Sequence, residues 1–186
     1  MISRILIFLI FSFFFSHSIY ASTKQKILNK FDKIDNLNFD FKQTIDGKDE
    51  RGNCTILYPK KIYCSYELNF NKILVSNGKS LVIKSDKNKQ YYIYPLDITP
   101  LNIILDKDFL IKNIKNLKGQ NIEDEYFAFK LEENGNIINI FFDKKNYNII
   151  GWQTEDVYQN LSVTYIYNLK INTQIKKNLF KLPKMH

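Results

Sequence analysis

The sequence predicts a mainly β protein of the α+β class, with a strongly curved antiparallel sheet or incomplete barrel covered by two helical pieces. About ten short segments alternate apolar and polar residues, and turn signals such as Asn77-Gly78 separate them. Two stretches, near residues 23–34 and 99–105, have apolar residues at helical spacing. No repeat or low-complexity linker interrupts the chain, so we expect a single domain over residues 22–186.

The chain begins with a segment typical of a secretory signal peptide. Arg4 supplies a positive charge, residues 5–15 are almost continuously apolar, and a more polar stretch ends at Ala21. An uncleaved anchor is the alternative, but the apolar run falls short of the ~20 residues that a spanning helix needs. We therefore expect residues 1–21 to be removed. No cysteine stands at the cleavage region, so we expect no lipid anchor there and a soluble mature protein.

The net charge of the chain is +8, with lysines scattered rather than gathered in blocks. This distribution is typical of a solvated surface and argues against nucleic acid as a partner. A mild attraction to anionic membrane surfaces is compatible with the charge.

The first element expected is an amphipathic helix. Ile27, Phe31 and Ile34 fall on one face of it, and Ser22 or Thr23 is available as its cap. Strands are then expected at residues 37–42, 54–58, 62–66, 72–76, 80–84, 90–94, 126–131, 137–142, 148–154 and 161–169.

The two cysteines, Cys54 and Cys64, lie in the second and third of these strands. A turn at Pro59 places Ile56 opposite Ile62 and Cys54 opposite Cys64, and opposed residues have Cβ atoms about 4.5–5.5 Å apart. In an oxidising compartment this arrangement predicts a disulfide that fastens the hairpin. A metal site or a catalytic cysteine would need a histidine neighbour, which the predicted mature core lacks.

A short apolar helix is expected after the sixth strand. Leu101, Ile104 and Leu105 stand at helical spacing, and the Thr-Pro pair before them resembles an N-cap followed by proline at the first helical position. Residues 110–117 continue either as a loop or as a second helix.

Motifs of catalytic chemistry are missing from the sequence. It contains no P-loop, no dinucleotide-binding glycine pattern, no nucleophile elbow and no metal-ligand spacing, so we expect no enzyme activity, no cofactor and no metal. Bulky apolar residues are abundant instead. Because two helical pieces do not fill the concave face of a curved sheet, we expect leftover concave surface to bind an apolar ligand.

Five motifs, in order along the chain, carry a resemblance to one family. Residues 41–44 hold a Phe-x-Gln-Thr strand, and residues 58–66 are similar to an Arg-Pro-x-x-Phe-x-Trp hairpin. Residues 74–84 (LVSNGKSLVIK) are close to Leu-Val-Ser-Asp-Gly-Lys-x-Leu-Trp. Residues 99–105 resemble a Thr-Pro helix, and residues 178–183 (NLFKLP) a terminal Phe-x-Phe/Leu-x-Pro. Together they resemble the LolA-type periplasmic lipoprotein carriers.

The resemblance implies an incomplete β-barrel whose helical lid covers an apolar cavity for the acyl chains of lipoproteins. It implies a monomer in the periplasm that takes acylated lipoproteins from an inner-membrane ABC transporter and delivers them to an outer-membrane receptor. That receptor shares the fold but is itself a lipoprotein, so the missing lipid-attachment cysteine favours the carrier.

The expected site combines this resemblance with the alternation of residues along the strands. Alternation by itself does not say which face of each strand is concave. The cavity lining is expected to comprise Phe39, Phe41, Ile56, Ile62, Leu81, Ile83, Tyr91 and Ile93. The lid is expected to comprise Leu101, Ile104 and Leu105.

Three positions depart from the family pattern. Tyr58 replaces an arginine that in the family holds the lid shut, and a tyrosine donates only one hydrogen bond. Cys64 replaces the tryptophan, and Ile62 replaces the phenylalanine. We therefore expect the lid to be controlled differently in this chain.

Two alternatives in the binding class stay open: a carrier or sensor of another lipid on the same fold, and an assembly protein whose apolar face docks a partner. A lipid hydrolase is disfavoured, because the chain lacks a nucleophile–base pair.

Overall fold

The computed structural model describes residues 22–67, 70–155 and 160–185, and the predicted signal peptide, residues 1–21, lies outside the described residues. The strands are β1 (Asn36–Ile45), β2 (Lys48–Leu57), β3 (Lys61–Tyr66), β4 (Ile73–Asn77), β5 (Ser80–Ser85), β6 (Gln90–Pro95), β7 (Gln120–Ile122), β8 (Tyr126–Glu133), β9 (Asn136–Asp143), β10 (Ile149–Glu155) and β11 (Leu161–Ile171). The helices are α2 (Thr23–Asp32), α3 (Leu101–Leu105) and α4 (Lys107–Asn116), with single turns of 3-10 helix at η2 (Lys87–Lys89) and η3 (Leu96–Ile98).

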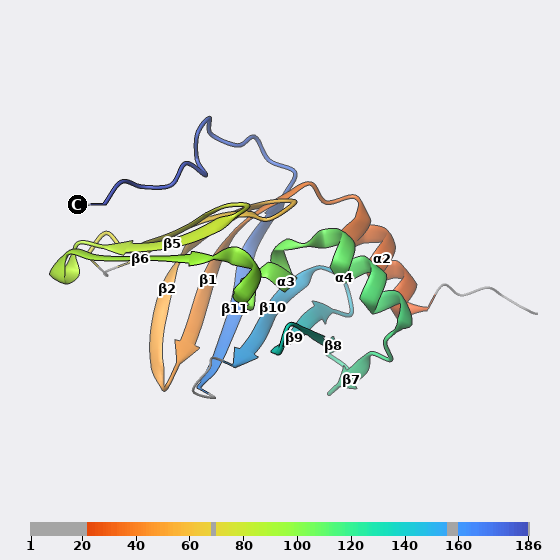
Figure 1. Cartoon of the computed structure of the whole chain (residues 1–186). Coiled ribbons are helices and arrows are strands. Elements are labelled where there is room, and N and C mark those ends of the chain that lie inside the picture. Colours follow the sequence, from red (N-terminus) through yellow and green to blue (C-terminus); the bar gives the residue numbers. More distant parts are fainter. Residues whose placement is uncertain (1–21, 68–69, 156–159, 186) are drawn as a thin grey trace, which may run out of the picture.

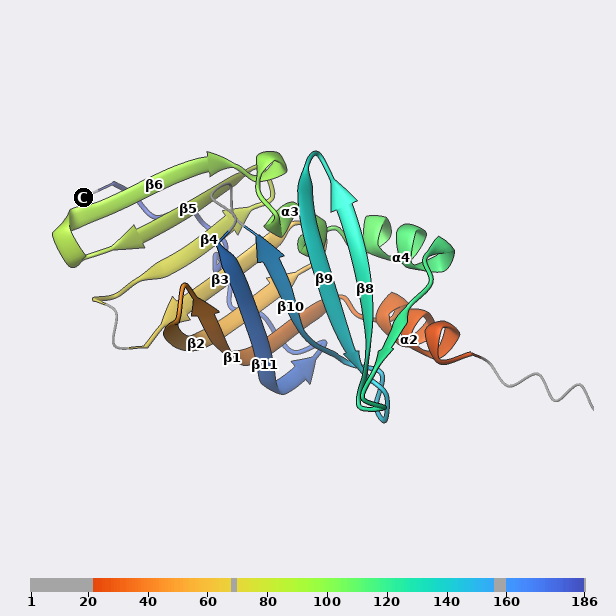
Figure 2. The ribbon, with the colours of Figure 1, turned by 90° about the horizontal axis from the view of Figure 1, so that it is seen from below.

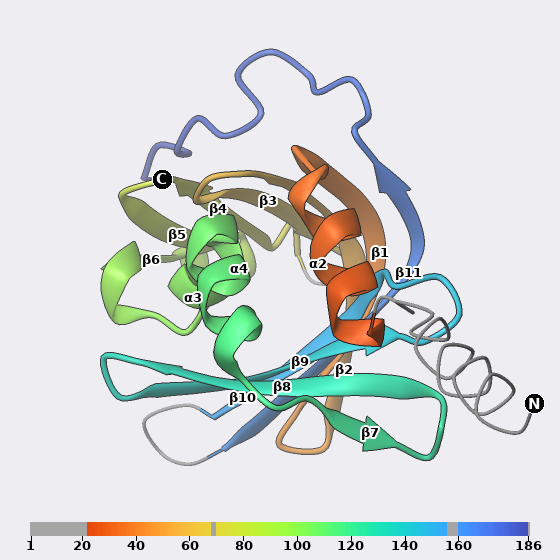
Figure 3. The ribbon, with the colours of Figure 1, turned by 90° about the vertical axis from the view of Figure 1, so that its right-hand side faces the viewer.

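The eleven strands of the described chain form one antiparallel sheet in the order β6-β5-β4-β3-β2-β1-β11-β10-β9-β8-β7. The sheet curves strongly but does not close, since β6 and β7 remain its two edges. Figure 3 shows the helices together on one side, between the two halves of the curved sheet. The predicted fold class, an incomplete antiparallel barrel with helical cover, is confirmed.

Helix α2 forms where the apolar spacing predicts it and ends at Asp32. The Ser22 hydroxyl caps it by accepting a hydrogen bond from the Gln25 N–H at 3.2 Å. Ile27 and Phe31 are buried, and the Phe31 ring packs edge-on against Phe142 of β9 at 6.0 Å. This packing closes one end of the core.

The predicted lid region is two helices, which resolves the alternative left open for residues 110–117. Asp106 separates α3 from α4 and caps α4, because its carboxylate accepts from the Phe109 N–H at 3.0 Å. The expected N-cap role of Thr99 is wrong. Its hydroxyl donates to the Leu96 carbonyl at 2.8 Å, and α3 begins at Leu101 with Pro100 as its N-cap.

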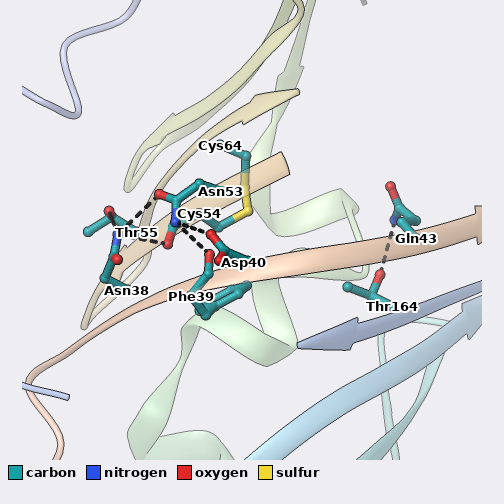
Figure 4. The surroundings of a disulfide bond; sticks show 9 residues. All are labelled: Asn38, Phe39, Asp40, Gln43, Asn53, Cys54, Thr55, Cys64 and Thr164. Carbon is teal, nitrogen blue, oxygen red and sulfur yellow. Dashed lines mark hydrogen bonds between the residues drawn. A yellow bond between two sulfur atoms is a disulfide. The ribbon is translucent and has the colours of Figure 1, made fainter. Parts of the chain in front are cut away.

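The hairpin of β2 and β3 has the predicted register. Ile56 lies opposite Ile62, and Cys54 opposite Cys64, with the cysteine Cα atoms 4.1 Å apart and a disulfide between the side chains. The predicted disulfide is therefore present (Figure 4). The peptide bond before Pro59 is cis.

The two faces of this part of the sheet differ in chemistry. The concave face carries the apolar core, whereas Asn38 and Asn53 lie on the convex face (Figure 4). The Asn38 amide donates to Asn53 Oδ1 at 3.1 Å and to Thr55 Oγ1 at 2.9 Å. The polar side chains of Asn38, Asn53 and Thr55 on the convex face thereby bond to one another.

The chain after β11 returns across the convex face, first beside residues of β1, β2 and β3 and then to β5 and β6 (Figure 1). The Tyr91 hydroxyl donates to the Pro183 carbonyl at 3.1 Å, and Lys84 Nζ donates to the Lys184 carbonyl at 3.1 Å. The C-terminal segment is thus fastened to the outside of β5 and β6.

Candidate functional site: a lidded apolar pocket

An apolar pocket of about 340 Å³ lies between the concave face of the sheet and the start of α3. This volume is at the lower end of the range of about 300–1,000 Å³ that is typical of small-molecule sites. Its apolar lining comes from β1 to β5, β10 and the lid. The lining residues are Phe41, Gln43, Ile45, Glu50, Cys54, Ile62, Cys64, Tyr66, Lys72, Leu74, Leu81, Ile83, Thr99, Pro100, Leu101, Trp152, Thr154 and Thr164.

The disulfide forms part of the pocket wall, because both Cys54 and Cys64 line it. Leu74 of β4 lies directly opposite Cys64 and extends the apolar surface onto the next strand. The disulfide therefore fixes two neighbouring strands at the place where a ligand would press against them.

Removing the disulfide should destabilise the fold modestly. Because the bond closes a short loop, we expect the double variant Cys54→Ser/Cys64→Ser to lose about 2–3 kcal/mol of unfolding free energy. Urea denaturation of the oxidised protein and of the variant measures this. Wild type treated with a reductant should match the variant, and an unchanged midpoint would contradict a stabilising disulfide.

Aromatic side chains shape the wall beside the disulfide. The rings of Phe41 and Tyr66 meet edge-on at 5.1 Å, and those of Phe39 and Trp152 at 6.2 Å. Such contacts hold rings in fixed orientations. The wall is therefore preformed.

One rim of the pocket is polar but internally paired. Lys72 Nζ lies 2.7 Å from the Glu50 carboxylate and 4.2 Å from the centre of the Tyr66 ring. Burial, together with the charge of Glu50, raises the pKa of the Tyr66 hydroxyl, so it stays protonated near neutral pH. The Gln43 amide donates to Thr164 Oγ1 at 3.2 Å. The mouth of the pocket therefore presents polar side chains, whereas its interior is apolar.

The lid helix α3 is tied to the sheet at both ends. The Asn102 amide donates to Glu133 of β8 at 2.9 Å. The Lys60 backbone N–H donates to the Leu105 carbonyl at 2.8 Å, and Lys60 Nζ lies 3.2 Å from Asp106 Oδ2. These contacts hold α3 against the sheet.

The structure brings five of the expected site residues into the pocket lining: Phe41, Ile62, Leu81, Ile83 and Leu101. Four others, Phe39, Ile56, Ile104 and Leu105, are almost fully buried in the core and do not line the pocket. The lid thus presents Leu101 to the pocket and buries its other apolar side chains beneath it.

The expected placement of Tyr91 and Ile93 in the cavity is wrong. Strand β6 pairs with β5 so that Tyr92 lies opposite Ile83 and Tyr94 opposite Leu81, the two lining residues. Tyr91 and Ile93 therefore point to the convex side, because a shift of one residue along a strand reverses the face.

Tyr58 lies near the lid but does not bond to it. It is buried, its ring meets Phe31 at 5.7 Å, and its hydroxyl has no hydrogen-bond partner among the described residues. Burial raises the pKa of this hydroxyl. The contact from this hairpin to the lid backbone comes from Lys60 instead.

Sequence reasoning missed several lining residues. Tyr66 continues the alternation of Ile62 and Cys64 along β3, so the pattern that predicts the hairpin was sufficient to find it. Leu74 lies on β4, and its place opposite Cys64 depends on the pairing of β4 with β3. Trp152 comes from β10, far along the chain, and no local pattern connects it with this pocket.

Known proteins resemble this chain both in sequence family and in fold. The family described as outer membrane lipoprotein carrier protein LolA matches residues 32–183. No curated protein sequence matches the chain significantly. A LolA superfamily protein from Nitrosomonas europaea is 12% identical, with a TM-score of 0.45 over 87% of this chain and 99% of that one. An uncharacterized conserved protein from Thermus thermophilus is 9% identical, with a TM-score of 0.51 over 88% and 95%. At such identities, structural similarity shows the fold alone.

Proteins of the LolA type are periplasmic carriers rather than enzymes. Within the described ranges, none of the helices combines the length and apolar character that crossing a bilayer requires. The family match extends over every described strand of the sheet and over α3 and α4. On this evidence the chain belongs to the LolA family of outer membrane lipoprotein carrier proteins.

Proposed function

We propose that this protein carries lipoproteins across the periplasm by holding their acyl chains in the lidded pocket. The observation that carries the proposal is the pocket itself: apolar walls from five neighbouring strands and β10, closed on one side by Leu101 of α3. A protein surface that merely docks a partner does not need a concave apolar pocket of this kind.

The physical argument is one of intermediate affinity. Each buried CH₂ group of an acyl chain contributes about 0.8 kcal/mol, so a rigid, fully closed pocket would release its cargo too slowly. If α3 must break its hydrogen bonds to Glu133 and Lys60 before cargo enters, the cost of breaking them makes the net binding free energy less favourable. The cargo then moves readily to an acceptor that binds it more strongly.

The proposed partners follow from the family. An inner-membrane ABC transporter supplies the acylated lipoprotein, and an outer-membrane receptor accepts it. Residues 22–186 form the mature monomer in this scheme, after cleavage of residues 1–21. The proposed acyl contacts are Phe41, Ile62, Leu81, Ile83 and Leu101, with no enzymatic step, metal or cofactor.

A second candidate is a carrier of a lipid with a single acyl chain. The pocket volume of about 340 Å³ favours it, because several long acyl chains need more room than a pocket of this size gives. Lipoprotein cargo therefore requires the lid to move, whereas a single-chain lipid does not.

A release experiment tests the proposed function. Inner membranes that contain labelled, outer-membrane-destined lipoproteins and their transporter are incubated with residues 22–186 and ATP. We expect a soluble one-to-one complex that forms with ATP and not without it. If no complex forms and the purified protein instead contains free single-chain lipid, the lipoprotein function is wrong and the second candidate stands.

A further inference from the structure

The net positive charge of this protein comes from one part of the fold. Residues 61–97 and 172–186 contain ten lysines and three carboxylates, whereas residues 22–60 and 98–171 contain sixteen basic and sixteen acidic side chains. The net charge of the chain after residue 21 therefore belongs entirely to the first pair of segments. We call their described part, β3 to β6 with their turns plus residues 172–185, the basic lobe.

These two segments are distant in sequence but lie together in space. Figure 1 shows the C-terminal segment crossing over the end of the molecule that β5 and β6 form. Hydrogen bonds from Lys84 and Tyr91 to the carbonyls of residues 184 and 183 hold it there. Lys87 and Lys89 in the turn before β6 and Lys79 before β5 are exposed. Lys184 thus lies at the same end of the molecule as Lys84 and the exposed lysines of the turns beside β5 and β6.

The rim of the basic lobe is also apolar. Strand β6 is an edge of the sheet, with no strand on its outer side among the described residues. Tyr92, Ile93 and Tyr94 on β6 are 47%, 56% and 41% exposed, and Ile98 in the next turn is 62% exposed. Figure 2 shows β6 as the outermost strand at this rim.

Bulky apolar residues exposed on an edge strand indicate a binding surface. Their exposure to water costs free energy, and the unpaired backbone of an open edge can pair with other chains. Tyrosine with its amphipathic ring, isoleucine and surrounding lysines are the residues that place a protein surface at a membrane interface. Lysine attracts anionic head groups, while the apolar side chains enter the boundary with the acyl chains.

We propose that the basic lobe docks this protein on anionic lipid bilayers, with β6 lying in the head-group region. The free backbone N–H and C=O groups of β6 stay hydrated at that depth, which they would not in the hydrocarbon core. This docking is separate from the pocket and does not depend on which cargo the pocket holds.

The rim formed by β6 lies next to the pocket wall, so docking would bring the bilayer close to the pocket. Tyr92 and Tyr94 lie on the concave face, directly opposite Ile83 and Leu81 of the pocket wall. A bilayer that contacts β6 is therefore one strand away from the pocket. An acyl chain that leaves the membrane at this rim meets apolar side chains throughout its path.

Vesicle binding tests the proposal. The folded protein, residues 22–186, is sedimented with vesicles of phosphatidylcholine alone or with added phosphatidylglycerol. We expect binding to the mixed vesicles that weakens strongly when the ionic strength rises from about 0.1 M to about 1 M, since the Debye length falls from about 10 Å to about 3 Å. No binding to the anionic vesicles would overturn the proposal and leave the rim for a protein partner.

Matched variants separate the basic lobe from general charge and hydrophobicity. Lys87→Gln/Lys89→Gln should lower the partition coefficient roughly tenfold to thirtyfold, whereas Lys118→Gln/Lys130→Gln, which changes two lysines that are also exposed but lie outside the lobe, should not. Ile93→Ser should weaken binding several-fold more than Leu161→Ser, which removes a leucine that is 46% exposed on β11. Circular dichroism checks that each variant folds. Equal loss in variant and control would overturn the proposal.

Discussion

Replacing Leu101 with aspartate should lower the affinity of the pocket for a fluorescent fatty acid by roughly a hundredfold or more. Leu101 is the lid residue that faces the pocket, and it is half-buried there. A carboxylate at this position must either lose water in an apolar wall or hold the lid open. Both outcomes remove binding free energy from an acyl chain. Fluorescence titration at neutral pH measures the change.

The control for this variant is Leu161→Asp, which introduces the same charge on an exposed leucine of β11 outside the pocket lining. The Leu161→Asp variant should bind the fluorescent fatty acid with the same affinity as the wild type. An unchanged affinity in Leu101→Asp, with normal folding, would show that the pocket under α3 does not bind the acyl chain.

The substitution Gly52→Ala should reduce the free energy of unfolding by roughly 3 kcal/mol. Gly52 lies on β2 between the Phe41 ring and the Ser65 backbone of β3, and an added Cβ would overlap the Ser65 carbonyl oxygen. Because a backbone carbonyl in a sheet cannot rotate away, β2 and β3 must separate locally. Urea denaturation followed by circular dichroism measures the loss.

Gly47→Ala in the turn between β1 and β2 provides the comparison. Gly47 has φ +71°, and nothing lies within 4 Å of an added Cβ. This variant should therefore lose only the roughly 1–2 kcal/mol that the left-handed backbone costs a residue with a side chain. Equal losses at Gly52 and Gly47 would mean that close packing at Gly52 is not limiting.

The attachment of α3 to the β2–β3 hairpin comes from Lys60 and not from Tyr58. Tyr58 occupies the place where the family resemblance implies an arginine, and its buried hydroxyl makes no bond to the lid. Two residues later, the Lys60 N–H reaches the Leu105 carbonyl and its ammonium reaches Asp106. The lid is held from the same hairpin turn by a different residue, which sequence comparison at Tyr58 alone did not predict.

Local patterns predicted those features that depend on neighbours in the chain. The tight turn at Pro59 sets the register of β2 and β3, so the pairing of Cys54 with Cys64 followed from counting residues. Amphipathic spacing likewise predicted α2. The alternation of Leu81 with Ile83 predicted a shared face for these two, because a strand has a period of two residues.

Tertiary structure decided which face is concave and which strands meet around the pocket. The turn at η2 sets the register of β6 against β5, and that register turned Tyr91 and Ile93 outward. The curvature of the sheet brought Trp152 of β10 to the wall, and docking of α3 separated Leu101 in the pocket from Ile104 in the core. Alternation along one strand fixes relative orientation only. Absolute orientation depends on contacts between segments that are far apart in the sequence.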